Sequence, residues 1–224
     1  MDVDLFLERK HEDSVIDIFR KRAEKLARTR NKRFMSSPLD GQDRELGADL
    51  FVTASTKFLI VEFKYQEPQI ANEADKPLRL ELCKALSADS FRMKQHVGCH
   101  LIAWSTAEDD PDVLLNKYCD EVCNAEIWKE SGLAASAPDK QGRIKDVEFI
   151  HDLLSAKLGL KYSAFSSYIQ WLKELAGDNN GRFELLMEHP DDDVVKALTF
   201  TTLQSLKAWL DNNPPKPKPP TVQI

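Results

Sequence analysis

Two short apolar runs, residues 48–53 and 57–64, are separated by only three small polar residues. Both runs are rich in β-branched and aromatic side chains and contain neither Gly nor Pro, so they predict the two strands of an antiparallel hairpin. Glu62 lies inside the second run among apolar neighbours, and Lys64 follows two residues later. Because side chains alternate between the faces of a strand, Glu62 and Lys64 share one face. The fold must therefore compensate the charge of a half-buried carboxylate.

Asp49 lies at the start of the first run, after Gly47 and Ala48. Pairing of the two strands across the short turn brings Asp49 beside Glu62, so that two carboxylates converge. A divalent cation would compensate their charge. The alternative is a solvated surface hairpin on which Glu62 and Lys64 form only a charge pattern, but the apolar residues around Glu62 favour a buried site.

The segments around the hairpin predict further elements of an α/β domain. Helical spacing of apolar residues predicts one long amphipathic helix over residues 5–28, and Gly and Pro predict a loop over residues 36–46. After the hairpin, the spacing predicts a helix over residues 78–97, and a short continuous apolar run predicts a buried strand over residues 99–104. A further helix is expected over residues 112–130.

The remaining chain predicts a second, helical region without a competing strand pattern. Three segments show helical spacing of apolar residues: 144–158, 163–175 and 194–210. Composition divides the chain into a core over residues 1–130, a linker over residues 131–142, a helical lobe over residues 143–212 and a disordered tail over residues 213–224. The tail is rich in Pro and Lys and cannot form a helix or a central strand.

The composition is that of an ordinary folded protein, with 224 residues, 42% hydrophobic and 30% charged. No apolar run approaches the roughly 20 residues of a membrane span, and the first ten residues are charged throughout, so we expect a cytoplasmic protein with no membrane partner. The four cysteines lack zinc-site spacing, and we expect reduced, buried thiols. Cys119 and Cys123 are four residues apart, but no second pair completes a metal site.

The order of these elements resembles the core of the PD-(D/E)XK nuclease superfamily over about residues 5–105. The resemblance consists of a helix that carries Glu, an Asp at a strand start, Glu-x-Lys on the next strand, and then a helix and a strand. Ala48 stands where the family usually has Pro. The resemblance implies a restriction-endonuclease-like αβββαβ core, with a mixed central sheet flanked by helices, followed here by the C-terminal helical lobe.

The resemblance also implies an activity, that of a nuclease dependent on Mg²⁺ or Mn²⁺. Such an enzyme hydrolyses DNA phosphodiester bonds by direct attack of water, in restriction, phage defence or repair. The implied metal ligands are Asp49, Glu62, the carbonyl of Phe63 and, through water, Glu12, with Glu8 as the second choice for the helix acid. Lys64 would orient or deprotonate the water and stabilise the developing charge.

DNA binding is expected from the basic residues around the end of the first helix, which could follow a phosphate backbone. The candidates are Arg20, Arg28, Arg30, Lys32 and Arg33. The alternative is a solvated helix end that pairs with neighbouring acids. The formal net charge of −6 excludes nonspecific coating of nucleic acid by the whole surface. From the second helix, Lys84, Arg92 or Gln95 is expected to reach the site, as in similar nucleases.

A second hypothesis is a catalytically silent relative that binds nucleic acid or a partner protein. Its helical lobe would mediate partner binding or a homodimer. The acidic net charge favours this hypothesis, whereas the intact set of Asp49, Glu62 and Lys64 favours the enzyme. The histidines show no grouping typical of a histidine-metal finger nuclease, so that class is not expected. No Gly-rich phosphate loop is present, so any nucleotide-driven step would belong to a partner.

Overall fold

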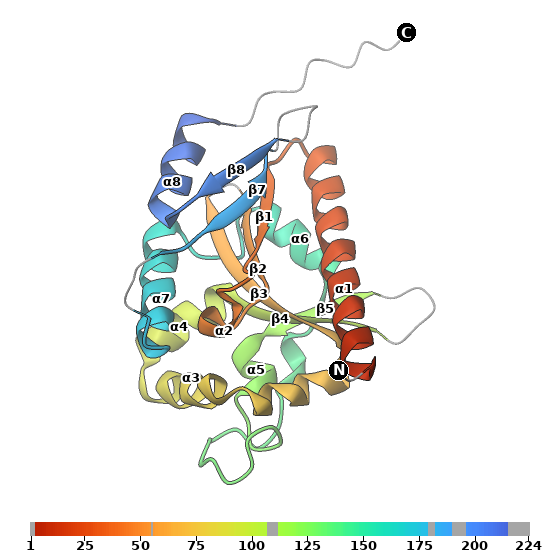
Figure 1. The fold of residues 1–224 in the computed structure, drawn as a ribbon, viewed down its shortest axis with the longest axis vertical. Coiled ribbons are helices and arrows are strands. Elements are labelled where there is room, and N and C mark those ends of the chain that lie inside the picture. Colours follow the sequence, from red (N-terminus) through yellow and green to blue (C-terminus); the bar gives the residue numbers. More distant parts are fainter. Residues whose placement is uncertain (1–2, 55, 107–111, 179–181, 190–195, 215–224) are drawn as a thin grey trace.

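The computed structural model describes residues 3–54, 56–106, 112–178, 182–189 and 196–214. A six-stranded sheet lies at its centre, with helices on both sides and a two-stranded hairpin at one end (Figure 1). None of the helices in these ranges has both the length and the apolarity to cross a membrane. In chain order the elements are α1 (Val3–Thr29), β1 (Phe34–Pro38), α2 (Asp43–Leu46), β2 (Leu50–Ala54), β3 (Lys57–Gln66), η1 (Glu67–Asp75), α3 (Pro77–Ala88), α4 (Ser90–Cys99), β4 (His100–Ser105), β5 (Val113–Lys117), α5 (Tyr118–Val122), η2 (Lys140–Gly142), β6 (Ile144–Lys145), α6 (Asp146–Leu154), α7 (Tyr162–Leu175), β7 (Leu185–Glu188), β8 (Ala197–Phe200) and α8 (Leu203–Asn212).

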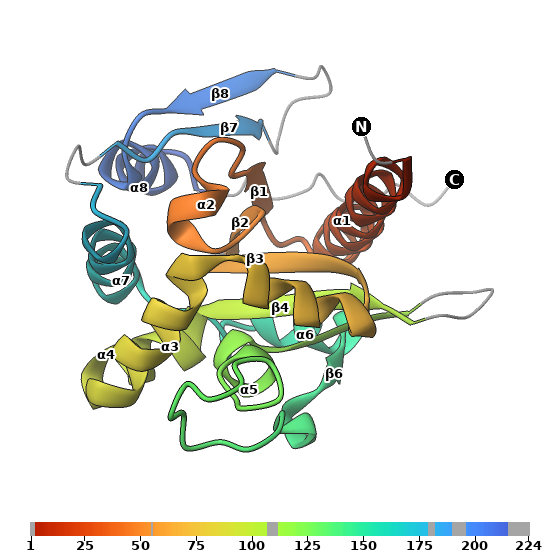
Figure 2. The same ribbon diagram turned by 60° about the horizontal axis from the view of Figure 1, so that its bottom comes forward.

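The six strands of the central sheet follow their order in the chain, from β1 to β6. Neighbouring strands are antiparallel except β3 and β4, which run parallel. A parallel neighbour requires a crossover connection, and η1, α3 and α4 provide it (Figure 2). The chain is therefore an α/β protein with a mixed sheet flanked by helices, and the predicted hairpin and buried strand are confirmed as β2, β3 and β4.

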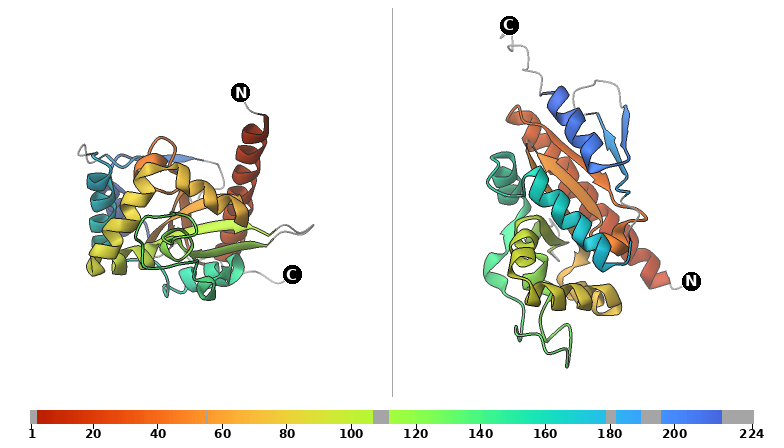
Figure 3. Two further views of the ribbon diagram at one scale, coloured as in Figure 1. Left: turned by 90° about the horizontal axis from the view of Figure 1, so that it is seen from below. Right: turned by 90° about the vertical axis from the view of Figure 1, so that its left-hand side faces the viewer.

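The two faces of β3 pack against different helices. Phe63 makes an edge-to-face contact with Phe19 of α1, at 5.6 Å between ring centroids. Phe58 points to the other face and stacks on Phe165 of α7 at 5.8 Å. The helices α1 and α7 therefore cover opposite sides of the sheet (Figure 3, left). Glu62 has the same parity as Phe58 and faces the side of α7.

Two segments differ from the sequence-based prediction. Residues 36–46 are not one loop, because β1 reaches into them and α2 follows. The helix predicted over residues 112–130 was wrong: Val113–Lys117 forms β5, which pairs with β4, and only Tyr118–Val122 is helical. The periodicity of a short apolar run does not distinguish a helix from a strand, and pairing with the buried β4 decides the outcome here.

The C-terminal region, residues 143–212, contains strands as well as the expected helices. β6 pairs with β5, and β7 pairs with β8 in a hairpin. The helices α6 and α7 confirm two of the three predicted helices, whereas α8 begins only at Leu203 because β8 takes residues 197–200. Residues 190–195, at the start of the third predicted helix, and residues 215–224 of the predicted tail lie outside the described residues.

One hydrophobic core includes residues from both the first 130 positions and the C-terminal region. Phe149 of α6 lies 6.2 Å from Phe19 of α1, and Phe183 lies 5.8 Å from Phe51 of β2, measured between ring centroids. The region expected to form a lobe thus shares its apolar surface with the central sheet.

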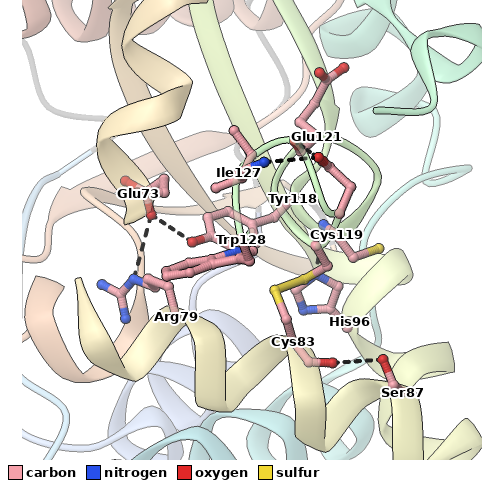
Figure 4. Close-up of a disulfide and its surroundings, with 12 residues drawn as sticks. Glu73, Arg79, Cys83, Ser87, His96, Tyr118, Cys119, Glu121, Ile127 and Trp128 are labelled. Carbon is pink, nitrogen blue, oxygen red and sulfur yellow. Dashed lines mark hydrogen bonds and ion pairs between the residues drawn. A yellow bond between two sulfur atoms is a disulfide. The ribbon is translucent and has the colours of Figure 1, made fainter. Parts of the chain in front are cut away.

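Cys83 of α3 and Cys123, which follows α5, form a disulfide (Figure 4). The expectation of reduced thiols was therefore wrong for this pair. Because α5 ends at Val122, the chain turns and brings Cys123 to within 5.2 Å of Cys83, measured between Cα atoms. Cys99 and Cys119 are free and buried, as expected, and Cys119 has no second thiol at position 123 for metal binding.

Candidate active site

Asp49 precedes β2 and is anchored to β3. Its N–H donates to the carbonyl of Val61 at 3.0 Å, and its Oδ2 accepts a hydrogen bond from the N–H of Phe63 at 2.6 Å. Val61 and Phe63 flank Glu62, so the carboxylates of Asp49 and Glu62 are neighbours. The N–H and C=O of a strand residue point toward the same neighbouring strand, so the carbonyl of Phe63 also faces Asp49.

Glu62 is a buried carboxylate that contacts two ammonium groups. It is only 1% exposed, and its Oε1 accepts hydrogen bonds from Lys64 at 2.6 Å and from Lys76 at 2.7 Å. Burial raises the pKa of Glu62, but the two ammonium groups outweigh burial and hold the pKa well below its usual value. Glu62 therefore remains ionised inside the protein.

Asp49 lies in a less compensated environment than Glu62. Burial raises the pKa of Asp49 well above its usual value, and the Glu62 carboxylate raises it further. The Lys64 ammonium and the hydrogen bond from Phe63 act in the opposite direction. The two neighbouring carboxylates therefore favour additional positive charge beside Asp49.

The oxygen atoms at this position fit a hard divalent cation. Among the described residues, Oδ1 of Asp49 and Oε2 of Glu62 accept no hydrogen bond, and the carbonyl of Phe63 lies on the same side. Mg²⁺ and Mn²⁺ prefer such oxygen donors. Within the part of the chain that the structure describes, no three Asp, Glu, His or Cys side chains form a metal-binding group, so water and backbone would have to complete the coordination.

Lys64 lies between two buried carboxylates. It is 5% exposed, and its ammonium is 2.6 Å from Glu62 and 2.9 Å from Glu73. Burial lowers the pKa of Lys64, but the carboxylates of Glu62 and Glu73 outweigh burial and raise the pKa well above its usual value. Lys64 is therefore a fixed positive charge beside Asp49 and Glu62.

Glu73 of η1 is a member of this cluster that sequence reasoning missed. It is completely buried and accepts a hydrogen bond from the hydroxyl of Tyr118 at 2.6 Å (Figure 4). Its Oε1 also accepts from Lys76 at 2.7 Å, and the Nε of Arg79 lies 3.6 Å from Oε2. A carboxylate in a polar segment between a strand and a helix carries no periodic pattern, so the sequence offered no signal for this role.

Glu12 lies on α1 within electrostatic range of the cluster. Burial raises the pKa of Glu12, and the charge of Lys64 partly opposes that effect. Glu62 also acts on the pKa of Glu12, so the expected helix acid is close enough to the site to sense its charges. The side chain of Glu8, the second choice, lies outside the described residues.

A cavity of about 530 Å³ opens beside Asp49 and Glu62. Its lining combines acidic and basic side chains with one apolar residue: Asp43, Arg44, Asp49, Glu62, Asp75, Lys76, Leu78 and Arg79. The buried ion pairs therefore meet solvent at this cavity, where Lys76 and Asp49 both line the wall.

The basic residues expected to bind DNA differ in their accessibility. Arg33 is buried, donates a hydrogen bond to the carbonyl of Asn213 and lies over the ring of Trp209, so its guanidinium is engaged within the protein. Arg20 donates to Ser36 at 3.1 Å and is partly buried. Trp209 of α8 and Asn213 cover Arg33 just before β1, and a basic run in the sequence does not reveal that cover.

The three other candidates, Arg28, Arg30 and Lys32, are exposed. At 1.5 Å per residue, Arg28 lies about 24 Å along α1 from Glu12. This basic group is therefore far from the carboxylates, and only a ligand of macromolecular length could contact both at the same time.

The residues expected to reach the site from the second helix do not do so. Lys84 is paired with Glu81 on the surface of α3. Arg92 donates to Ser167 of α7, and Gln95 donates to the carbonyl of Ala164 in the same helix. The predicted helix is divided at Asp89 into α3 and α4, which directs α4 toward α7. Instead, Lys76 and Arg79, at the start of α3, reach the site.

Comparisons of the chain with protein-family models, with curated proteins and with solved structures find no match. The chemistry available therefore follows from the residues themselves. Asp49 and Glu62 can hold a hard cation, and Lys64 adds a fixed positive charge on the same face of β3. Such an arrangement is suited to a reaction in which negative charge develops on a bound oxyanion.

Proposed function

We propose that this chain is a metal-dependent nuclease that hydrolyses phosphodiester bonds in DNA by direct attack of water. The observation that carries the proposal is the anchoring of Asp49 between Val61 and Phe63, which sets its carboxylate beside Glu62 with Lys64 on the same strand face. An acidic pair and an adjacent ammonium at the edge of a cavity are the groups that metal-assisted hydrolysis requires.

The order of elements supports a restriction-endonuclease-like core. The helix α1 precedes three antiparallel strands, β1 to β3, and the α3–α4 crossover leads to the parallel strand β4. This is the αβββαβ order of the PD-(D/E)XK nucleases that the sequence resembles. The short helix α2 and the η1 segment are additions to that order.

In this proposal Asp49, Glu62 and the carbonyl of Phe63 hold Mg²⁺ or Mn²⁺, and Glu12 contributes through water. When bound, the cation supplies positive charge that favours ionisation of water and offsets charge on the phosphate. Lys64 orients the attacking water and stabilises charge that develops on the phosphate oxygens. Its buried contacts with Glu62 and Glu73 hold the ammonium in place for this task.

DNA is the proposed substrate, and we assign its phosphate contacts to cations at two places. Lys76 is 40% exposed in its side chain and lines the cavity. Arg28 lies at the far end of α1, about 24 Å along the helix from Glu12, and Arg30 and Lys32 follow the end of that helix. A duplex of about seven base pairs spans that length at 3.4 Å per pair, so one DNA could contact both places.

A catalytically silent DNA- or protein-binding module is the second candidate, and one observation favours it. Lys64 and Lys76 both donate to Glu62, so this carboxylate is already neutralised by the protein's own cations. In a silent module that ion-pair cluster would serve stability alone. The C-terminal region would then supply the partner surface or a homodimer contact.

Cleavage of supercoiled plasmid in the presence of Mn²⁺ or Mg²⁺ tests the proposal. The wild-type protein should nick or linearise the plasmid, and Asp49→Asn should reduce the rate at least 100-fold. Asp75→Asn is the matched control, since Asp75 lines the same cavity but is exposed. Absence of metal-dependent cleavage by the wild type, or equal rates for Asp49→Asn and the control, would favour the silent module.

A further inference from the structure

A chain of four hydrogen bonds runs through the core behind the candidate site. It links α5, α4, α7 and β4 to the turn before Asp49. The N–H of Cys119 donates to His96 Nε2 at 3.1 Å, and His96 Nδ1 lies 2.6 Å from the hydroxyl of Tyr168. The same hydroxyl lies 2.8 Å from His100 Nδ1, and His100 Nε2 lies 2.7 Å from the carbonyl of Gly47.

The two ends of this chain determine the direction of every hydrogen bond. A backbone N–H can only donate, so His96 accepts at Nε2 and carries its proton on Nδ1. A backbone carbonyl can only accept, so His100 carries a proton on Nε2, and as a neutral imidazole it accepts at Nδ1. Tyr168 therefore accepts from His96 and donates to His100. Each donor has one acceptor, and both imidazoles are neutral.

The neutral state of both imidazoles agrees with their surroundings. Both rings are completely buried. Burial lowers the pKa of His96 well below its usual value, and burial lowers the pKa of His100 to about 4. Arg79 adds to that effect on His100, whereas Glu62 and the hydrogen bond to Gly47 oppose it.

The chain of hydrogen bonds ends at the peptide that leads to Asp49. Gly47 has a φ of +70°, a left-handed conformation that favours glycine, and its N–H donates to the carbonyl of Asp43 at 2.8 Å. A Cβ on Gly47 would lie 3.0 Å from the Arg79 guanidinium, so this side of the turn is also occupied. The bond from His100 holds the Gly47–Ala48 peptide, and Ala48 is completely buried.

We propose that His100 is a positioning residue for Asp49. Through its hydrogen bond to Gly47 it fixes the peptide two residues before the carboxylate, and Tyr168 and His96 hold His100 in the tautomer that can donate. This inference rests on the proposed function for its consequence, the binding of a divalent cation by Asp49. The positioning of Asp49 by His100 itself involves only residues of this protein.

Two substitutions at His100 test the two hydrogen bonds of its imidazole one at a time. The amide of Gln reaches the position of Nε2, so His100→Gln keeps a donor to Gly47 and loses the acceptor for Tyr168. The shorter amide of Asn reaches only the position of Nδ1, so His100→Asn keeps the acceptor for Tyr168 and loses the bond to Gly47. Each variant leaves one buried bond unmade, so their costs in stability are comparable and the effect on Asp49 differs.

The amide proton of Phe63 reports on Asp49 without any need for activity, because it donates to Asp49 Oδ2 at 2.6 Å. By NMR, this proton should resonate far downfield and exchange slowly in the wild type and in His100→Gln. In His100→Asn it should move upfield and exchange at least tenfold faster. Mn²⁺ affinity measured by calorimetry should fall about tenfold in His100→Asn and stay within twofold of the wild type in His100→Gln.

Nitrogen NMR of the wild type supplies a test that needs no variant. His100 should carry its proton on Nε2 and His96 on Nδ1, and the opposite tautomer at His100 would overturn the inference. Equal behaviour of the Phe63 amide in both His100 variants would also overturn it. If the wild type binds no Mn²⁺ while the Phe63 amide responds only in His100→Asn, the nuclease proposal fails and the positioning of Asp49 by His100 stands.

Discussion

The ammonium of Lys64 lies 2.9 Å from the carboxylate of Glu73, although β3 and η1 carry these residues on separate segments. Glu73 is completely buried and is held in turn by the hydroxyl of Tyr118. Lys64 is therefore fixed from two sides, by Glu62 on its own strand and by Glu73. A lysine held in this way keeps its charge in one place beside Glu62.

The first prediction concerns Glu73 and stability. Glu73→Gln removes a buried charge that is paired with Lys64 and Lys76, and it should lower the free energy of unfolding by about 3 kcal/mol, since it leaves buried cations less compensated. Glu81→Gln is the matched control on α3, because Glu81 and Lys84 form an exposed pair at 3.6 Å, and its effect should stay below about 0.5 kcal/mol. Urea unfolding measures both, and equal effects would contradict the structural role of Glu73.

A second prediction distinguishes the two candidate metal ligands. Glu62→Gln breaks hydrogen bonds to two ammonium groups and should destabilise the fold by about 3 kcal/mol. Asp49→Asn keeps an acceptor for Phe63 and removes repulsion from Glu62, so its stability should lie within about 1 kcal/mol of the wild type or above it. Thermal unfolding of the apo proteins compares them, and a larger loss for Asp49→Asn would contradict the charge distribution described here.

The disulfide provides a third prediction. It closes a loop with a sequence separation of 40 between Cys83 and Cys123, which the chain-entropy relation equates to about 4 kcal/mol of stability. Reduction should therefore lower the midpoint of urea unfolding of the wild type. The same reductant should leave Cys83→Ser unchanged. A wild-type midpoint that is insensitive to reduction, once loss of the bond is verified by mass, would contradict the prediction.

A fourth prediction concerns acid stability. Burial lowers the pKa of His100 to about 4, whereas an unfolded His titrates near 6.5. Below pH 6.5 the unfolded chain binds a proton at His100 that the folded chain does not bind. The contribution of neutral His100 to stability is therefore complete above that pH and is lost as the pH falls toward 4. Between pH 7 and pH 5, His100 alone should lower the free energy of unfolding by about 2 kcal/mol. His96 lowers it in the same direction.

Unfolding free energies at several pH values test this dependence. His100→Gln should show a weaker dependence on pH than the wild type. The exposed His151 is the control position, and His151→Gln should retain the wild-type dependence. A full wild-type dependence in His100→Gln would show that other groups control acid stability.

The core of the candidate site could be predicted because the features it depends on are local. Strand alternation fixes the shared face of Glu62 and Lys64, and a short turn fixes the position of Asp49 opposite Glu62. Both follow from fewer than twenty consecutive residues. The mixed sheet was expected only through the resemblance to the PD-(D/E)XK core, and the crossover through η1, α3 and α4 allows β3 and β4 to run parallel.

The remainder of the site depends on contacts between distant segments. Glu73 reaches Lys64 from η1, and its carboxylate is held there by the hydroxyl of Tyr118, a residue that the sequence placed in a longer helix. The burial of Arg33 depends on Trp209 of α8, far along the chain. Neither contact follows a periodic pattern in the sequence. Tyr118 follows β5, which pairs with β4, and the apolar residues of β5 are equally compatible with a helix by their spacing.

The central claim, that Asp49 and Glu62 hold a divalent cation, is tested most directly by calorimetric titration of the apo protein with Mn²⁺. The wild type should bind Mn²⁺ at one site, Asp49→Asn should lose that site, and Asp75→Asn should retain it with an affinity within about twofold, as screened surface charges allow. Absence of binding to the wild type, or undiminished binding to Asp49→Asn, would contradict the account.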